Sequence, residues 1–330
     1  MSKLALDRKL AALEALRSSD DRAASCDQLR KALNDRNNYV VSRAAAVAAD
    51  MRCDELLADV LAAFDRFFVD PVKSDPQCLA KSALARALRD LGHRGAQAFL
   101  RGIVHVQLEP TWGGRADSAG TLRGICALAL VDCPLDPLEI LTYLADALAD
   151  PDKLVRINSA IAISQLGRPE GVLLLRLKLL SGDGEPDVLG QCFTSLLSLE
   201  PTGGVSFVSR FLKSTDAEVQ LEAASALAQC RDPQAVETLA EFWQEPLLSL
   251  DLRRAIVISL AASPLPEAAE FLLTCVSHEP PQLAETAIAS LATSRFRAEL
   301  RPRLATAVTT RANAHLKSIF DQTFAPATPT

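Results

Sequence analysis

Aromatic residues and net positive charge are both scarce in this 330-residue chain. Aromatic residues make up 5% of the sequence, with two tryptophans and two tyrosines. Because β-sheet cores draw on aromatic and β-branched side chains, this scarcity disfavours a sheet-based fold. The formal net charge is -6, so the surface as a whole repels nucleic acids and anionic membranes. Nucleic-acid binding is therefore disfavoured.

Cysteine motifs are missing as well. The eight cysteines are scattered, with no C-x-x-C pair and no clustered histidines beside them. They are Cys26, Cys53, Cys78, Cys126, Cys133, Cys192, Cys230 and Cys275. This spacing predicts neither a disulfide framework nor a zinc site, and free cysteines of this kind pack as small hydrophobes in a reducing compartment. We expect a cytoplasmic protein with no cofactor and no metal.

Long uncharged apolar segments are also lacking. No stretch reaches the roughly 18 residues of a membrane span. The first residues, MSKLALDRKLAALEALR, carry charges at helical spacing where a signal peptide has an apolar core. We therefore expect no membrane segment.

One helical pattern recurs along most of the chain. A nine-residue unit aligns without gaps in five places: VRINSAIAI from Val155, VLGQCFTSL from Val188, VQLEAASAL from Val219, LRRAIVISL from Leu252 and LAETAIASL from Leu283. The same template fits LRGICALAL from Leu122 and, less well, LAKSALARA from Leu79 and VSRAAAVAA from Val41. Successive units begin 31 to 43 residues apart, which is the length of two helices with their turns.

The composition of the unit explains how such helices would pack. Its fifth and eighth positions are mostly Ala, Ser or Cys, and residues three apart share a helix face, so a neighbouring helix can approach closely. An Asp precedes seven of the eight units, as expected where a carboxylate accepts the first free N–H groups of a helix. A second amphipathic run precedes each unit, and Pro or Gly separates the runs. The pattern predicts alternating helices and turns.

The unit resembles the HEAT repeat, and within that family the short bacterial variety found in phycobilisome lyases. The best match is DPDKLVRINSAIAI, with Asp150, Asp152, Val155, Arg156 and Ala160. The resemblance implies an all-α protein, a right-handed α-solenoid of about eight HEAT-like helix pairs. We expect an N-terminal capping helix in 1–25, the repeat array in 26–295, a C-terminal capping helix in 296–322 and a disordered tail in 323–330.

The longest interval between units contains the segment EPTWGGRADSAGTLR, residues 109–123, and a loop insertion is expected at about 107–121. Trp and Arg supply much of the energy at binding surfaces, and glycines permit positive φ. The candidate binding residues are Trp112, Gly113, Gly114, Arg115 and Asp117. The alternative is that Trp112 folds back over the seam between repeats.

Arginine recurs at the second position of the unit, as Arg123, Arg156 and Arg253. In the resembling family such arginines pair with Asp along the array, and Asp152 lies four residues before Arg156, a spacing that permits a pair on one helix face. A structural ladder is favoured over ligand binding.

No catalytic motif stands out, since the chain has neither G-x-S-x-G nor a recognisable Cys–His pairing. We expect a non-catalytic bacterial scaffold or adaptor whose partner is another protein. Two enzymatic alternatives follow from the same resemblance: a lyase-like enzyme acting on a tetrapyrrole chromophore of a partner protein, and a HEAT-like DNA-repair glycosylase. The acidic balance and the low aromatic content argue against the glycosylase. The partner's identity and the oligomeric state stay open.

Overall fold

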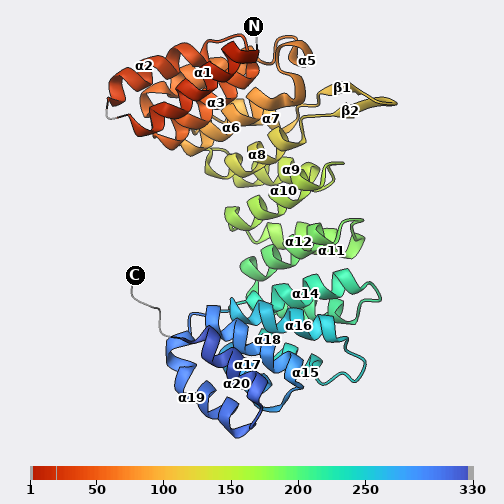
Figure 1. The fold of residues 1–330 in the computed structure, drawn as a ribbon. Coiled ribbons are helices and arrows are strands. Elements are labelled where there is room, and N and C mark those ends of the chain that lie inside the picture. The colour runs from red at the N-terminus through yellow and green to blue at the C-terminus, as the bar shows by residue number, and fades with distance from the viewer. Residues whose placement is uncertain (1–2, 20, 326–330) are drawn as a thin grey trace. The chain divides into compact units, whose positions relative to one another are not determined.

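The computed structural model describes residues 3–19 and 21–325. The chain is helical almost throughout and divides into two compact units, Met1–Leu166 and Gly167–Thr330, which are described separately (Figure 1). In the described residues the helices pack as adjacent pairs, which confirms an all-α solenoid of repeats. None of the described helices combines the length and apolar character that a bilayer crossing requires.

The first unit contains ten α-helices and a two-stranded hairpin among its described residues. Its α-helices are α1 (Lys3–Ala15), α2 (Arg22–Leu33), α3 (Asn38–Asp50), α4 (Leu57–Arg66), α5 (Pro71–Ser74), α6 (Leu79–Asp90), α7 (Ala96–Ile103), α8 (Gly120–Ala129), α9 (Pro137–Ala147) and α10 (Lys153–Leu166). The strands are β1 (Leu108–Thr111) and β2 (Gly114–Asp117), and the short 3-10 turns are η1 (Leu16–Ser18), η2 (Asp54–Leu56), η3 (Pro76–Cys78) and η4 (Leu130–Asp132).

The second unit continues the alternation, with ten α-helices among its described residues. They are α11 (Glu170–Ser181), α12 (Pro186–Leu199), α13 (Pro201–Val208), α14 (Ala217–Gln229), α15 (Pro233–Phe242), α16 (Leu250–Ala261), α17 (Pro266–His278), α18 (Pro281–Thr293), α19 (Arg297–Thr310) and α20 (Ala314–Thr323). One 3-10 segment, η5 (Ser209–Lys213), extends α13.

The helices that carry the nine-residue unit stack on one another within each unit. Helices α3, α6, α8 and α10 form one row, and α12, α14, α16 and α18 form another. Most of them also pack against the helix that precedes them in their pair, as α18 does on α17, whereas α16 packs against α17, the helix that follows it. Small residues at the fifth position, such as Cys126, Ser159 and Ala223, are fully buried. The alanine-sized seams predicted from the sequence are therefore where helices meet.

The register of two units differs by one residue from the predicted alignment. In α6 the buried face comprises Ala80, Leu84, Ala87 and Leu88, whereas Arg86 is exposed. The unit therefore begins at Ala80 and not at Leu79. In α3 the same burial pattern begins at Val40, one residue before the predicted start. These alanine-rich helices offer nearly equivalent registers when only their small and apolar residues are compared.

Both ends of the chain hold more helices than predicted. Helix α1 ends at Ala15, and α2 begins within the predicted N-terminal cap, where the Asp21 carboxylate accepts the N–H of Ala24. The predicted single C-terminal helix is two helices, α19 and α20, because Ala312 takes a left-handed φ of 50° and Asn313 caps α20. Within the predicted tail, Thr323 closes α20 and Phe324 is buried, and residues 326–330 lie outside the described residues.

Candidate functional site

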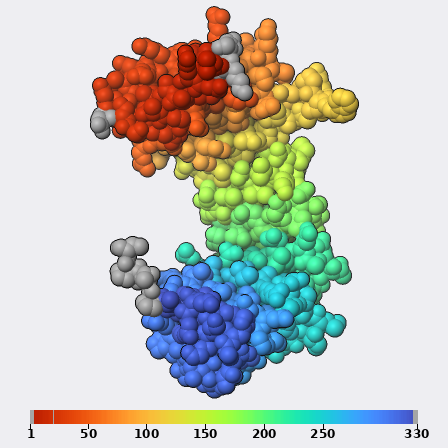
Figure 2. Space-filling model, viewed as in Figure 1, coloured from red at the N-terminus to blue at the C-terminus, as the bar shows by residue number. Residues whose placement is uncertain are grey.

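The insertion between α7 and α8 forms a β-hairpin where an irregular loop was predicted. Strands β1 and β2 pair antiparallel, from Leu108 opposite Asp117 to Thr111 opposite Gly114. Gly113 lies in the connecting turn with a φ of +93°, a conformation that favours glycine. Figure 2 shows the hairpin, in yellow, projecting from the body of the first unit.

Trp112 lies in the hairpin turn with its side chain in solvent. Its relative exposure is 106%, so the side chain does not fold back over the seam between repeats. Arg115 is exposed on β2, and Gly114 has open space around it. Large apolar side chains are also exposed on the way to the hairpin: Val104, Val106 and Leu108. Four of the five candidate binding residues therefore lie together at the tip.

The fifth candidate, Asp117, belongs to the base of the hairpin. Its carboxylate accepts N–H groups of Gln107 at 2.9 Å and Ala119 at 3.0 Å, and Nη1 of Arg123 at 2.5 Å. Burial alone would raise the pKa of Asp117, but these donors outweigh it and hold the pKa below its usual range. Asp117 anchors the strand end while the tip remains accessible.

Glu109 forms a second anchor. Its Oε1 accepts the N–H of Gln77, the amide of Gln107 and the hydroxyl of Ser118, each at 2.6 Å. Burial opposes ionisation here too, yet these donors lower the pKa of Glu109. The hairpin is thereby tied to the turn before α6.

That turn contains a buried ion pair. Lys81 Nζ lies 3.0 Å from Asp75 Oδ2, and both side chains have zero exposure. Asp75 also accepts Asn38 Nδ2 and the N–H of Ala80, while its backbone carbonyl accepts Gln107 Nε2. Since a buried charge is tolerated only when it is paired and hydrogen-bonded, this network determines one local geometry.

The backbone of the same turn is strained. Gln77 and Cys78 have φ values of 62° and 54°, in the left-handed region that side chains with a Cβ rarely adopt. Each such residue costs about 1 kcal/mol or more and persists when its surroundings over-determine it. Here the contact from Glu109 to the Gln77 N–H supplies part of that constraint. The strain and the buried charges support the hairpin at its base.

The recurrent arginines make structural contacts. Arg123 is nearly buried and forms a bidentate pair with Asp150, with N–O distances of 2.7 and 2.8 Å. It also donates to the carbonyl of His105. Asp152 accepts the N–H of Leu154, and Arg156 donates to the backbone carbonyl of Asp150, so the Asp152–Arg156 pair stays a prediction.

The second position of the unit serves a recurring purpose. In five of the eight units its side chain donates to a carbonyl at the end of an earlier helix or within three residues of that end, where carbonyls lack helical partners. The pairs are Lys81 to Phe67, Arg123 to His105, Arg156 to Asp150 and Pro151, Gln220 to Leu212, and Arg253 to Glu245. Arg253 in addition lies over the ring of Trp243 at 4.7 Å. The ladder is thus a series of helix caps.

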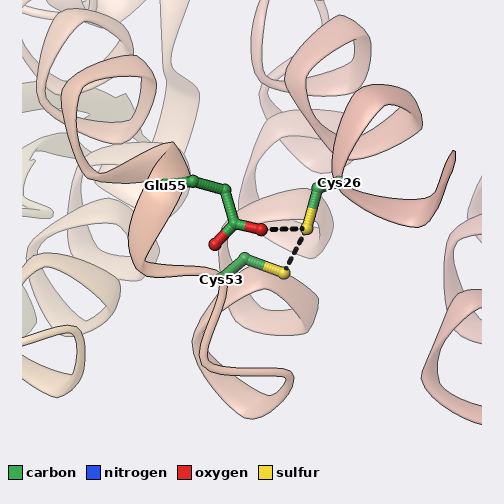
Figure 3. Close-up of side chains that lie close together, drawn as sticks. All are labelled: Cys26, Cys53 and Glu55. Carbon is green, nitrogen blue, oxygen red and sulfur yellow. Dashed lines mark hydrogen bonds between the residues drawn. The ribbon is translucent and has the colours of Figure 1, made fainter. Parts of the chain in front are cut away.

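The sequence did not predict a second cluster of side chains, which lies apart from the hairpin. Cys26, Cys53 and Glu55 meet in the first unit, with their ligand atoms within 4.8 Å of one another (Figure 3). Among the described residues this is the group of three whose side chains could hold a metal ion. Cys26 and Cys53 are 27 residues apart, so no short motif could reveal it.

The stacked helix pairs place the protein among the α-solenoids. A family model described as HEAT repeats matches residues 204–292, from α13 to α18, so this part of the chain is similar to HEAT repeats. The match covers less than a third of the chain and does not reach the hairpin. No curated protein matches the sequence.

Solved structures similar to the chain include two engineered proteins and human deoxyhypusine hydroxylase in complex with glycerol. One engineered protein is 16% identical, with 96% of this chain and 97% of that chain covered and a TM-score of 0.39. The hydroxylase is 16% identical, with 78% and 90% covered and a TM-score of 0.30. The other engineered protein is 18% identical, with 90% and 94% covered and a TM-score of 0.18. Scores this low carry no information about function.

Proposed function

We propose that the protein is a non-catalytic scaffold that binds another protein through the hairpin between α7 and α8. The observation that supports this most directly is the full exposure of Trp112 in the hairpin turn. A solvated tryptophan has no stabilising role in its own fold, whereas tryptophan is among the residues that contribute most to binding when a partner buries it.

Contacts at the base of the hairpin hold its tip in one orientation. Glu109 and Asp117 each accept hydrogen bonds from donors outside the hairpin turn, and the Asp75–Lys81 pair is buried beneath them. A pre-organised binding element loses little conformational entropy when the partner binds. The exposed Val104, Val106 and Leu108 extend the apolar surface, so the expected partner offers an apolar pocket for the indole.

The finer resemblance to phycobilisome-lyase repeats, a bacterial source and a cytoplasmic location remain hypotheses. The lyase-like and glycosylase alternatives have no specific observation among the described residues in their favour. Scaffolding requires only a presented surface, which the hairpin supplies.

Affinity capture from native lysate with the wild type and Trp112→Ala in parallel tests the proposal. Leu247→Ala is the matched control, because Leu247 is an equally solvated apolar side chain in the second unit. We expect a protein that the wild type and Leu247→Ala retain and Trp112→Ala loses. Equal recovery by all three proteins would refute the role of the hairpin.

A photo-crosslinking residue at Trp112 provides a direct second measurement. Crosslinking from the hairpin turn to the captured protein, and not from position 247, is the expected result. If both positions crosslink equally, the hairpin is not the binding element.

A further inference from the structure

Three potential metal ligands meet at the first helix pair of the array. Cys26 belongs to α2, Cys53 follows α3, and Glu55 lies in η2. The Cys26 Sγ lies 2.9 Å from Cys53 Sγ and 3.0 Å from Glu55 Oε1 (Figure 3). Both cysteines are buried, while Glu55 is half exposed, so the cluster is reached from solvent on the carboxylate side.

The backbone holds Cys53 in place. Helix α3 ends in a Schellman motif, in which Cys53 N–H donates to Ala48 O and Arg52 N–H donates to Ala49 O, both at 3.0 Å. Arg52 occupies the left-handed position with a φ of 51°, where glycine is usual. This strained turn directs the Cys53 side chain towards α2.

The chemistry of the donors favours a cation. Cys26 Sγ lies within hydrogen-bonding distance of both Cys53 Sγ and Glu55 Oε1, so the three ligand atoms point at one another. If both cysteines lose their protons, two thiolates and a carboxylate at these distances repel one another, and a cation among them removes that repulsion. Arg22 reaches Glu55 only at 3.8 Å, at its outer oxygen. Two sulfur ligands and one oxygen ligand suit a thiophilic divalent ion.

We propose that Cys26, Cys53 and Glu55 bind one thiophilic divalent cation of the zinc class, with water as the fourth ligand. Binding replaces two S–H bonds by two metal–sulfur bonds, and both protons leave to solvent without oxidation or reduction. Tetrahedral bonds of about 2.3 Å place two sulfurs about 3.7 Å apart, so the sulfurs need to separate by about 0.8 Å from their present 2.9 Å. Small side-chain rotations supply that change. The ion would join α2 to the turn after α3.

Titration of the full-length reduced protein with Co²⁺ and Zn²⁺ tests this site. We expect one ion per chain, a thiolate-to-cobalt charge-transfer band in the near ultraviolet, and release of two protons, measured by calorimetry in buffers of different ionisation enthalpy. Cys26→Ser and Cys53→Ser should each weaken binding by more than the roughly 10- to 100-fold cost of a lost outer contact. Cys133→Ser removes a buried cysteine outside the cluster and should bind as the wild type does.

Other results would overturn the proposal. One is a wild-type protein without the charge-transfer band, and another is binding that Cys26→Ser leaves unchanged. A third is a loss of two hydrogens in the intact mass under mild oxidation with no metal uptake, which would identify a disulfide pair. If the serine variants fail to fold, Glu55→Gln replaces them, because Glu55 is half exposed and both thiols are retained. Weaker metal binding by Glu55→Gln would support the site, and unchanged binding would refute the three-ligand set.

Discussion

The two tryptophans of this protein occupy opposite environments. Trp112 is fully exposed in a hairpin turn, whereas Trp243 has 4% exposure. Trp243 donates its indole N–H to Glu279 at 2.8 Å and packs edge-on against Phe271. The Trp112 side chain is available to a partner, whereas the Trp243 side chain is packed inside the protein.

The arginine at the second position of the nearest unit also has different contacts in the two regions. Near the hairpin, Asp117 lies six residues before Arg123 and pairs with it. In the second unit the residue six before Arg253 is Leu247, which is solvated, and the guanidinium lies over the Trp243 ring instead. The same position is satisfied by charge pairing in one region and by a cation–π contact in the other.

The largest expected effect comes from breaking the base of the hairpin. Lys81→Met leaves the Asp75 carboxylate buried without its cation, and losing one partner of a buried pair costs about 3 to 5 kcal/mol. Denaturant unfolding followed by circular dichroism should show this loss. Lys73→Met, at an exposed lysine of the same region, should change the stability by less than about 0.5 kcal/mol. A loss below about 1 kcal/mol in Lys81→Met would show that the pair does not hold the turn.

A smaller effect is expected at the buried tryptophan. Trp243→Phe removes the hydrogen bond to Glu279 and part of the ring beneath Arg253, at a cost of about 2 kcal/mol. The matched change Trp112→Phe should leave unfolding within about 0.5 kcal/mol of the wild type. Similar costs at both positions would contradict the contrast between a structural and an exposed tryptophan.

The smallest effect concerns pH. Donors hold the pKa of Asp117 below its usual value, so the carboxylate contributes stability above the unfolded pKa, near 4, and loses it as pH falls through the folded pKa. Asp117→Asn should therefore cost about 1 kcal/mol at pH 7, and the difference from the wild type should shrink towards pH 3. Unfolding at several pH values measures this.

The control for the pH experiment is Asp7→Asn, because Asp7 is exposed on α1 beyond its first turn. It should match the wild type at every pH. A cost of Asp117→Asn that stays constant between pH 7 and pH 3 would mean that the charge of Asp117 does not anchor the hairpin.

Several features were predictable because they depend on neighbours in sequence. The spacing of small and apolar residues predicted the rows of stacked helices, and Asp216 caps α14 as expected, accepting the N–H groups of Glu218 and Val219. The sequence also contains a spacing that the alignment of the units did not use. An Asp lies six residues before the basic second position at Asp75–Lys81, Asp117–Arg123 and Asp150–Arg156. That spacing would have corrected the register of α6.

The alternation of helices and turns within the repeat array was determined by the sequence alone, because the periodicity of apolar residues and the capping residues act over a few positions. Tertiary structure alone decided that Lys81 is buried, that Glu109 reaches Gln77, and that Cys26 meets Cys53. Such contacts join segments about 30 residues apart, and their geometry follows from how one helix pair packs on the next. The exposure of Trp112 was decided at the same level, since a turn is solvated only when no neighbouring repeat covers it.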